Sequence, residues 1–175
     1  MSLHMGEKSY VMEPCHVLCY DCRKPDGTLP TVLVGKYCSI AVNCTFLLGH
    51  HRYDLVSTTP CYTRHLSDHG KGNLSGYSRG DINIGNDVWI GANCTLMDNI
   101  RIGNGAVVAA ASVVVKDVPA YAIVGGNPAR VIKYRFTPEQ IEGLERTKWW
   151  DLPDAPVHTD DIDGFIRDHT ADERR

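Results

Sequence analysis

The chain has 175 residues, of which 43% are apolar, and it carries a formal net charge of −3. This length favours one compact domain with short appendages, and the apolar content excludes wholesale disorder. No basic stripe dominates any segment, which argues against a nucleic-acid-binding protein, and no run approaches the roughly 20 apolar residues of a membrane span. The first ten residues hold no apolar signal core, so we expect a soluble, cytoplasmic protein with no membrane partner.

Three of the seven cysteines cluster near the N-terminus: Cys15, Cys19 and Cys22. Because the number of cysteines is odd and no secretory signal precedes them, we expect reduced thiols rather than a disulfide framework. The C-x3-C-x2-C spacing also occurs in radical iron–sulfur enzymes, but those enzymes need a large barrel for which this chain is too short. The spacing therefore predicts a structural role.

Aliphatic or aromatic residues recur at every sixth position in two stretches of the chain. The short stretch contains Val34, Ile40 and Phe46, and the long one contains Ile84, Ile90, Leu96, Ile102, Val108 and Val114. A mostly small residue follows four positions later: Cys38, Cys44, Val88, Cys94, Ile100, Ala106, Ser112 and Val118. A period of six fits neither a 3.6-residue helix nor a two-residue strand alternation. It predicts a mainly β, three-sided solenoid whose stacked coils bury both sets of side chains.

Glycine and asparagine follow the inward aliphatic residues, as in Gly85-Asn86, Gly91-Ala92-Asn93 and Gly103-Asn104. These residue types suit corners that need unusual backbone dihedrals. The small inward positions include three cysteines, Cys38, Cys44 and Cys94. We therefore expect these cysteines to be small buried hydrophobic residues and not ligands.

The period breaks between Phe46 and Asp81, because Val34 and Ile84 are fifty residues apart, which is not a multiple of six. Residues 47–81 are polar and rich in Gly, Ser and His, and a loop of this length in a compact domain is usually functional. We expect an excursion from one corner of the solenoid. His65 and His69 could chelate a metal only on a helix, which the neighbouring glycines disfavour, so no metal site is predicted.

A C-terminal helical extension is predicted for residues 136–175, after a solenoid domain of residues 1–135. Thr137 is a suitable cap, and Pro138 suits the first turn of a helix. One apolar face would consist of Ile141, Leu144 and Trp149, and two prolines would end the helix, Pro153 and Pro156. A second short helix is expected beyond Thr159, with apolar residues Ile162, Phe165 and Ile166.

These features resemble the hexapeptide acyltransferases. Besides the repeats, the resemblance lies in residues 49–60 (GHHRYDLVSTTP), 84–92 (IGNDVWIGA) and 113–132 (VVVKDVPAYAIVGGNPARVI). The ending at residues 148–153, KWWDLP, is similar to the xenobiotic acetyltransferase branch, which includes enzymes that acetylate chloramphenicol and streptogramins. The resemblance covers roughly residues 31–156. His50 stands where the family usually has Asn, and the segment before Val34 does not match clearly.

The resemblance implies a left-handed parallel β-helix and a homotrimer with active sites between subunits. It also implies that acetyl-CoA donates an acetyl group to a hydroxyl or amine of a small acceptor, an antibiotic or a sugar. A nucleotide-sugar N-acetyltransferase and a non-catalytic assembly module are the alternatives. A zinc carbonic anhydrase is a further relative, but it needs histidines on the coils, and residues 81–136 contain none.

Acyl transfer needs a group that removes the nucleophile's proton, and histidine suits this task because its pKa lies near neutrality. By its match to the loop histidine of the family, the resemblance implies that His51 is the general base, with His50 in reserve. A catalytic imidazole also needs an acceptor that orients its other nitrogen. Asp54 or a backbone carbonyl could serve.

The resemblance also indicates residues that bind coenzyme A. Ala92 and Ala110 match residues whose main chain contacts the pantetheine arm, and Val115 and Lys116 match residues nearer the adenosine. The cations expected near phosphates are Lys116, Arg130 and Lys133. Trp89 is expected to project outward, either near the thioester or into a trimer interface.

Overall fold

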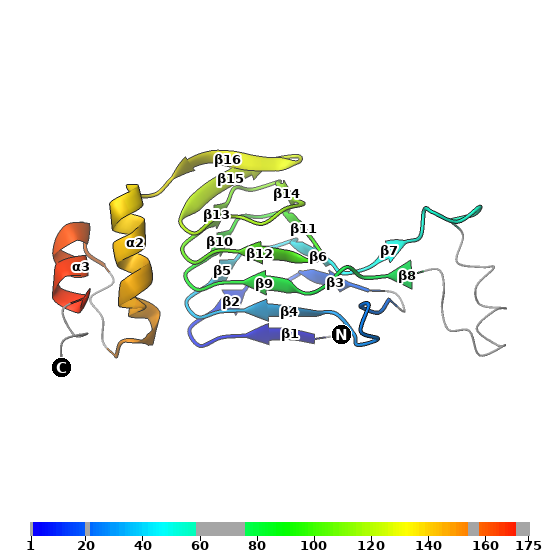
Figure 1. Ribbon diagram of the computed structural model, residues 1–175, viewed down its shortest axis with the longest axis horizontal. Helices are drawn as coiled ribbons and strands as arrows, with labels where there is room; N and C mark the ends of the chain where they lie inside the picture. The colour runs from blue at the N-terminus through cyan, green and yellow to red at the C-terminus, as the bar shows by residue number, and fades with distance from the viewer. Residues whose placement is uncertain (1, 20–21, 59–75, 154–157, 171–175) are drawn as a thin grey trace.

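The computed structural model describes residues 2–19, 22–58, 76–153 and 158–170 (Figure 1). Three parallel sheets form the faces of a column. The first sheet contains β1 (Ser2–Met5), β4 (Thr31–Val34), β9 (Ile82–Ile84) and β12 (Ile100–Ile102). The second contains β2 (Tyr10–Val11), β5 (Ser39–Ile40), β10 (Trp89–Ile90), β13 (Val107–Val108) and β15 (Ala122–Gly126), capped by antiparallel β16 (Ala129–Tyr134). The third contains β3 (His16–Leu18), β6 (Thr45–Leu47), β11 (Thr95–Met97) and β14 (Val113–Val114).

One strand from each sheet makes one coil, which confirms the predicted left-handed parallel β-helix. The residues of the six-residue period are all buried, from Val34 to Val114, and so are the residues four positions later, from Cys38 to Val118. Each coil thus covers its inner face with its neighbours. The prediction for Cys38, Cys44 and Cys94 is confirmed as to burial, and burial raises the pKa of the Cys38 thiol.

The structure adds a first coil that the sequence analysis does not predict. Strands β1 to β3 lie before Val34, and Met5, Val11 and Val17 pack against the core at the same six-residue spacing. Residues 22–30 then run without strand structure until β4 begins. Val17 and Val34 are therefore seventeen residues apart, which is not a multiple of six. The interruption of the period is the reason that the sequence analysis does not detect the first coil.

The corners differ from the prediction. The third residue after the inward aliphatic residue has a positive φ, at Tyr37, Asn43, Asp87, Asn93, Asn99, Gly105, Ala111 and Tyr121. The predicted unusual dihedral is present at Asn93, but Gly85, Gly91 and Gly103 do not have a positive φ, so the prediction is wrong for these glycines. The glycines of the first corner are needed because the coils approach closely: a Cβ on Gly35 would lie 2.7 Å from the carbonyl carbon of Gly85.

The prediction of reduced thiols is wrong for one pair of cysteines. Cys19 and Cys22, at the end of the first coil, form a disulfide. Their Cα atoms are 5.9 Å apart, within the range that a disulfide spans. Among the described residues, Cys15, Cys38, Cys44 and Cys94 are free thiols.

Helices α2 and α3, which follow β16 in the chain, lie beside the column (Figure 1). The side chain of Thr137 caps α2 (Pro138–Thr147) in a capping box with Gln140, as the sequence predicts for the start. The helix ends earlier than predicted, because Lys148 adopts a left-handed conformation before the 3-10 helix η1 (Trp149–Asp151). The predicted second helix is present as α3 (Ile162–Thr170). No helix within the described ranges is long and apolar enough to cross a membrane.

Candidate active site

The excursion leaves the column after β6 and returns before β9. Its described ends pair as a two-stranded antiparallel ribbon, β7 (His50–His51) with β8 (Gly76–Tyr77), which projects from the column (Figure 1). His50 lies opposite Tyr77, and His51 lies opposite Gly76. Successive side chains of a strand point to opposite faces, so the two histidines have different surroundings.

His51 is exposed, and its Nδ1 lies 2.9 Å from the carbonyl oxygen of Thr58. A carbonyl oxygen can only accept a hydrogen bond, so Nδ1 carries the proton of the neutral ring. The lone pair is then on Nε2. This is the tautomer and the exposure that a general base needs.

Asp54 is not the group that orients His51, contrary to the first of the two predicted possibilities. Its carboxylate instead pairs with the guanidinium of Arg52, which holds the pKa of Asp54 below its usual range. The backbone carbonyl of Thr58 takes the orienting role.

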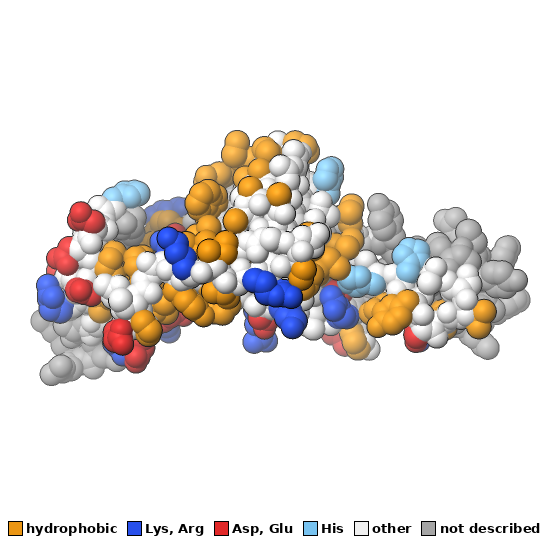
Figure 2. Space-filling view, turned by 90° about the horizontal axis from the view of Figure 1, so that it is seen from above, with side chains coloured by type: hydrophobic (Ala, Val, Ile, Leu, Met, Phe, Trp, Pro, Cys, Tyr) orange, Lys and Arg blue, Asp and Glu red, His pale blue; other side chains and the backbone are white. Residues whose placement is uncertain are grey.

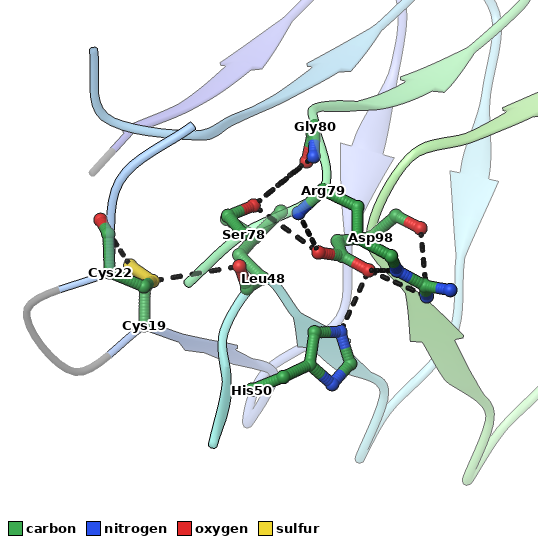
Figure 3. Close-up of polar contacts among 8 residues, drawn as sticks. All are labelled: Cys19, Cys22, Leu48, His50, Ser78, Arg79, Gly80 and Asp98. Atoms are coloured by element: carbon green, nitrogen blue, oxygen red, sulfur yellow. Dashed lines mark hydrogen bonds and ion pairs between the residues drawn. A yellow bond between two sulfur atoms is a disulfide. The ribbon is translucent and has the colours of Figure 1, made fainter. Parts of the chain in front are cut away.

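His50 is held against the column and is less available than His51. Its Nε2 lies 2.7 Å from Oδ1 of Asp98, whose side chain is fully buried (Figure 3). Its ring also lies 5.7 Å from the ring of Tyr77. The reserve candidate for the base is therefore already bonded to the wall of the column.

A shallow pocket of about 370 Å³ lies beside the ribbon, lined by Arg52, Tyr53, Asp54 and Tyr77. The chain that follows His51 exposes apolar side chains, and Tyr53 is 81% exposed. Figure 2 shows hydrophobic and histidine side chains exposed together near this end of the molecule. The pocket thus combines aromatic rings with one ion pair, and one of those rings, that of Tyr77, lies beside His50.

Three of the predicted coenzyme A residues lie along the corner between the second and third sheets. Ala92 and Ala110 occupy successive coils, and the Ala92 carbonyl accepts a hydrogen bond from the amide of Ala111. Arg130 lies opposite Gly125 in the β15–β16 pair at the same edge and is exposed. This corner presents small residues with a cation close by.

Trp89 projects outward from the second sheet, as predicted, and is 57% exposed. Its neighbours on the strands above and below are Val107 and Ser39. Lys133 lies on the same sheet, opposite Ile123 at the top of the column, and is exposed. The second sheet therefore presents a partly apolar outer face.

Val115 and Lys116 directly follow β14, at the far edge of the third sheet, and Lys116 is exposed. The β11–β14 register places them above Met97 and Asp98, on the corner that bears the ribbon. One chain thus places Ala92, Ala110 and Arg130 at one edge of the third sheet and Val115 and Lys116 at the other, while Trp89 and Lys133 lie on the second sheet.

The sequence analysis missed Thr58, Tyr77, Arg79 and Asp98. Asp98 had a signal: it lies two residues after the inward Leu96, so strand alternation turns it inward, where a charged residue is unexpected. The contacts that Thr58, Tyr77 and Arg79 make had no comparable signal in the sequence. Within the described part of the chain, no His, Cys, Asp or Glu group could hold a metal, and His65 and His69 lie outside it.

Comparisons with known proteins identify the family of the chain. The model of the bacterial transferase hexapeptide family (six repeats) matches residues 81–116. A chloramphenicol acetyltransferase of Morganella morganii is 37% identical over 90% of this chain and 80% of its own length. A probable macrolide acetyltransferase of Lysinibacillus sphaericus is 41% identical over 68% of each chain. A hexapeptide-repeat containing acetyltransferase from Vibrio cholerae O1 biovar eltor, solved with acetyl coenzyme A, is 28% identical, with a TM-score of 0.54 over 77% of this chain and 72% of that chain.

The stacked coils and the relatives together define an acyltransferase built on a left-handed parallel β-helix. The chain belongs to the hexapeptide-repeat acyltransferases, in the branch of the xenobiotic acetyltransferases. It is an acetyltransferase, and its acetyl donor is acetyl-CoA.

Proposed function

We propose that the protein is a homotrimer that transfers the acetyl group to a hydroxyl or amine of a small antibiotic-like acceptor, with His51 as general base. The observation that carries the proposal is the bond between Nδ1 of His51 and the Thr58 carbonyl. It fixes the tautomer with a free lone pair on Nε2, on a side chain open to a bound acceptor.

In the proposed reaction, Nε2 of His51 removes the acceptor's proton while the acceptor oxygen or nitrogen attacks the thioester carbonyl carbon. The bond from carbon to sulfur then breaks, and the departing sulfur takes the proton from the imidazolium. The products are the acetylated acceptor and free coenzyme A. The Thr58 carbonyl stabilises the imidazolium between the two steps, because it accepts a hydrogen bond from Nδ1–H throughout.

The pocket beside the ribbon supports an acceptor with an apolar surface. Tyr53 and Tyr77 supply aromatic rings, and the Arg52–Asp54 pair supplies polar contacts. The relatives named chloramphenicol acetyltransferase and probable macrolide acetyltransferase support the same class of acceptor. A sugar is the second candidate, because its hydroxyls could bond to the same ion pair.

Assembly from several copies is supported by the position of the coenzyme A candidates. One chain holds five of the seven at opposite edges of the third sheet, so a neighbouring copy would have to supply the second wall of a site that contains His51. The second sheet exposes large apolar side chains that copies could bury: Tyr10, Trp89, Ile132 and Tyr134. Burial of such a face is what stabilises a homo-oligomer.

The test combines calorimetric titration of acetyl-CoA with an assay of thiol release from acetyl-CoA. The acceptors are chloramphenicol, a macrolide, maltose and an amino-sugar nucleotide. His51→Ala should lower kcat by roughly 10²–10⁴-fold and leave the affinity for acetyl-CoA nearly unchanged. The matched control is His4→Ala, because His4 is an exposed histidine on the first coil.

Each alternative has its own outcome. Absence of acetyl-CoA binding at millimolar ligand would favour the non-catalytic assembly module. Thiol release with the amino-sugar nucleotide alone would favour the nucleotide-sugar N-acetyltransferase. Full activity of the His51→Ala variant would refute the assignment of the base.

A further inference from the structure

Asp98 is a carboxylate in a place that favours an apolar side chain. It directly follows β11, and the β6–β11 register places it above Leu48, which is fully buried. The Asp98 side chain has no exposure to solvent. A carboxylate in such a position is costly unless charged and hydrogen-bonding groups compensate it.

The groups that compensate Asp98 come from the two ends of the excursion (Figure 3). Oδ1 accepts from Nε2 of His50 at 2.7 Å and from Nε of Arg79 at 2.8 Å. Oδ2 accepts from the backbone amide of Arg79 at 2.6 Å and from the hydroxyl of Ser78 at 3.3 Å. One carboxylate therefore joins β7 to the residues that follow β8, at the point where both meet the column.

These hydrogen bonds of Asp98 form a joint between the column and the ribbon, and this joint determines which way His51 faces. His50 and His51 are neighbours on β7, and side chains alternate along a strand. Because His50 is bonded to the column wall, His51 is turned to the other face of the ribbon, where it is exposed. The backbone of the ribbon could rotate if the His50 and Arg79 bonds were lost, and the imidazole of His51 would move with it.

We propose that Asp98 is a positioning residue for the acetyl transfer, acting through His50 and Arg79 to fix the ribbon that presents His51. The inference rests on the proposed role of His51. Displacement of a catalytic group by about 1 Å can lower the rate by about 10²-fold, so a joint of this kind controls kcat without touching either substrate. Residue 50, where the family usually has Asn, is then one half of a pair with Asp98.

The test compares four variants of the full chain. Asp98→Asn removes the charge, and His50→Leu removes the donor at nearly constant volume. His50→Gln is the rescue variant, because its amide nitrogen can reach Asp98 as Nε2 of His50 does. Asp87→Asn is the matched control: Asp87 also accepts from a guanidinium, that of Arg135 at 2.9 Å, but it lies between β9 and β10, at the corner between the first and second sheets.

Asp98→Asn and His50→Leu should lower kcat by about 10- to 100-fold, with the KM for acetyl-CoA unchanged within about twofold. His50→Gln should keep kcat within about threefold of the parent, and Asp87→Asn should leave it unchanged. Amide hydrogen exchange should accelerate at residues 50–51 and 76–79 in Asp98→Asn and not in Asp87→Asn. The exchange measurement needs no activity, so it tests the joint even if His51→Ala stays active and the proposed base is wrong.

Three results would overturn the inference. The first is unchanged kcat and unchanged exchange of the ribbon in Asp98→Asn. The second is a uniform acceleration of exchange over the whole column, with acetyl-CoA binding and kcat lost together, which would show a role in overall folding. The third is an equal loss of kcat in His50→Gln and His50→Leu, which would contradict the proposed role of the donor.

Discussion

The close stacking of the coils predicts that Gly35→Ala destabilises the column. A Cβ at this position would lie 2.5 Å from the carbonyl oxygen and 2.7 Å from the carbonyl carbon of Gly85, on the coil above. These are backbone atoms, so they cannot turn aside as a flexible side chain would. The φ of Gly35 is not positive, and the effect should therefore come from coil spacing and not from backbone strain.

The magnitude follows from the movement that the methyl group requires. Ordinary contact begins near 3.4 Å, so relief of the 2.5 Å contact requires the two coils to part by about 0.9 Å. The bond from the Gly35 amide to the Ile84 carbonyl, 2.9 Å, and the bond from the Asp87 amide to the Lys36 carbonyl, 2.8 Å, would stretch to about 3.7–3.8 Å. Two weakened hydrogen bonds and local overpacking, less the entropy that Ala removes from the unfolded chain, give about 2–4 kcal/mol.

Urea denaturation at one fixed protein concentration measures the change in the free energy of unfolding. Ala41→Gly is the control, because Ala41 occupies the equivalent position at the second corner and should change stability by less than about 1 kcal/mol. If Gly35→Ala proved as stable as the parent within about 0.5 kcal/mol, the column would not be held at the spacing described, and the reasoning would be refuted.

Two further predictions concern pH and the donor substrate. Burial raises the pKa of Cys38 above its ordinary 9.0, so the folded chain keeps a proton that the unfolded chain loses. The contribution of Cys38 to the free energy of unfolding should therefore be intact below pH 9 and be lost progressively above it. Cys38→Ala should make the fall of this free energy with pH shallower by up to about 1.4 kcal/mol per pH unit. An unchanged slope of the free energy against pH, measured by urea denaturation, would contradict this. Lys116→Ala should weaken binding of coenzyme A more than binding of dephospho-coenzyme A in calorimetric titration, because we place Lys116 near the 3′-phosphate; equal losses would remove it from that position.

The sequence predicts the column well because its period is set by packing alone. Every sixth residue must fill the inside of a coil, so Ile84, Ile90 and Leu96 reveal the coils without any long-range information. The first coil was missed because residues 19–30 interrupt the same period after Val17. The early end of α2 was missed because a left-handed residue such as Lys148 carries no signal in residue type.

The candidate site was predictable only in part. The resemblance indicated His51, but no local pattern shows that the Thr58 carbonyl orients it or that Asp54 is paired with Arg52. The partners of Asp98 come from residues 48 and 19 positions away, and contacts at such separations depend on how the excursion returns. Asp98 lies two residues after the inward Leu96, so strand alternation turns its side chain inward. This was the one available sign in the sequence that a polar cluster lies there.

The most direct measurement is a crystal structure of the assembled protein with coenzyme A and an unreactive acceptor. We expect the thiol to lie in a cleft between two copies, with Nε2 of His51 within about 3.5 Å of the acceptor's hydroxyl or amine. Coenzyme A bound away from the ribbon, or Nε2 of His51 turned to bulk solvent in every copy, would contradict the account.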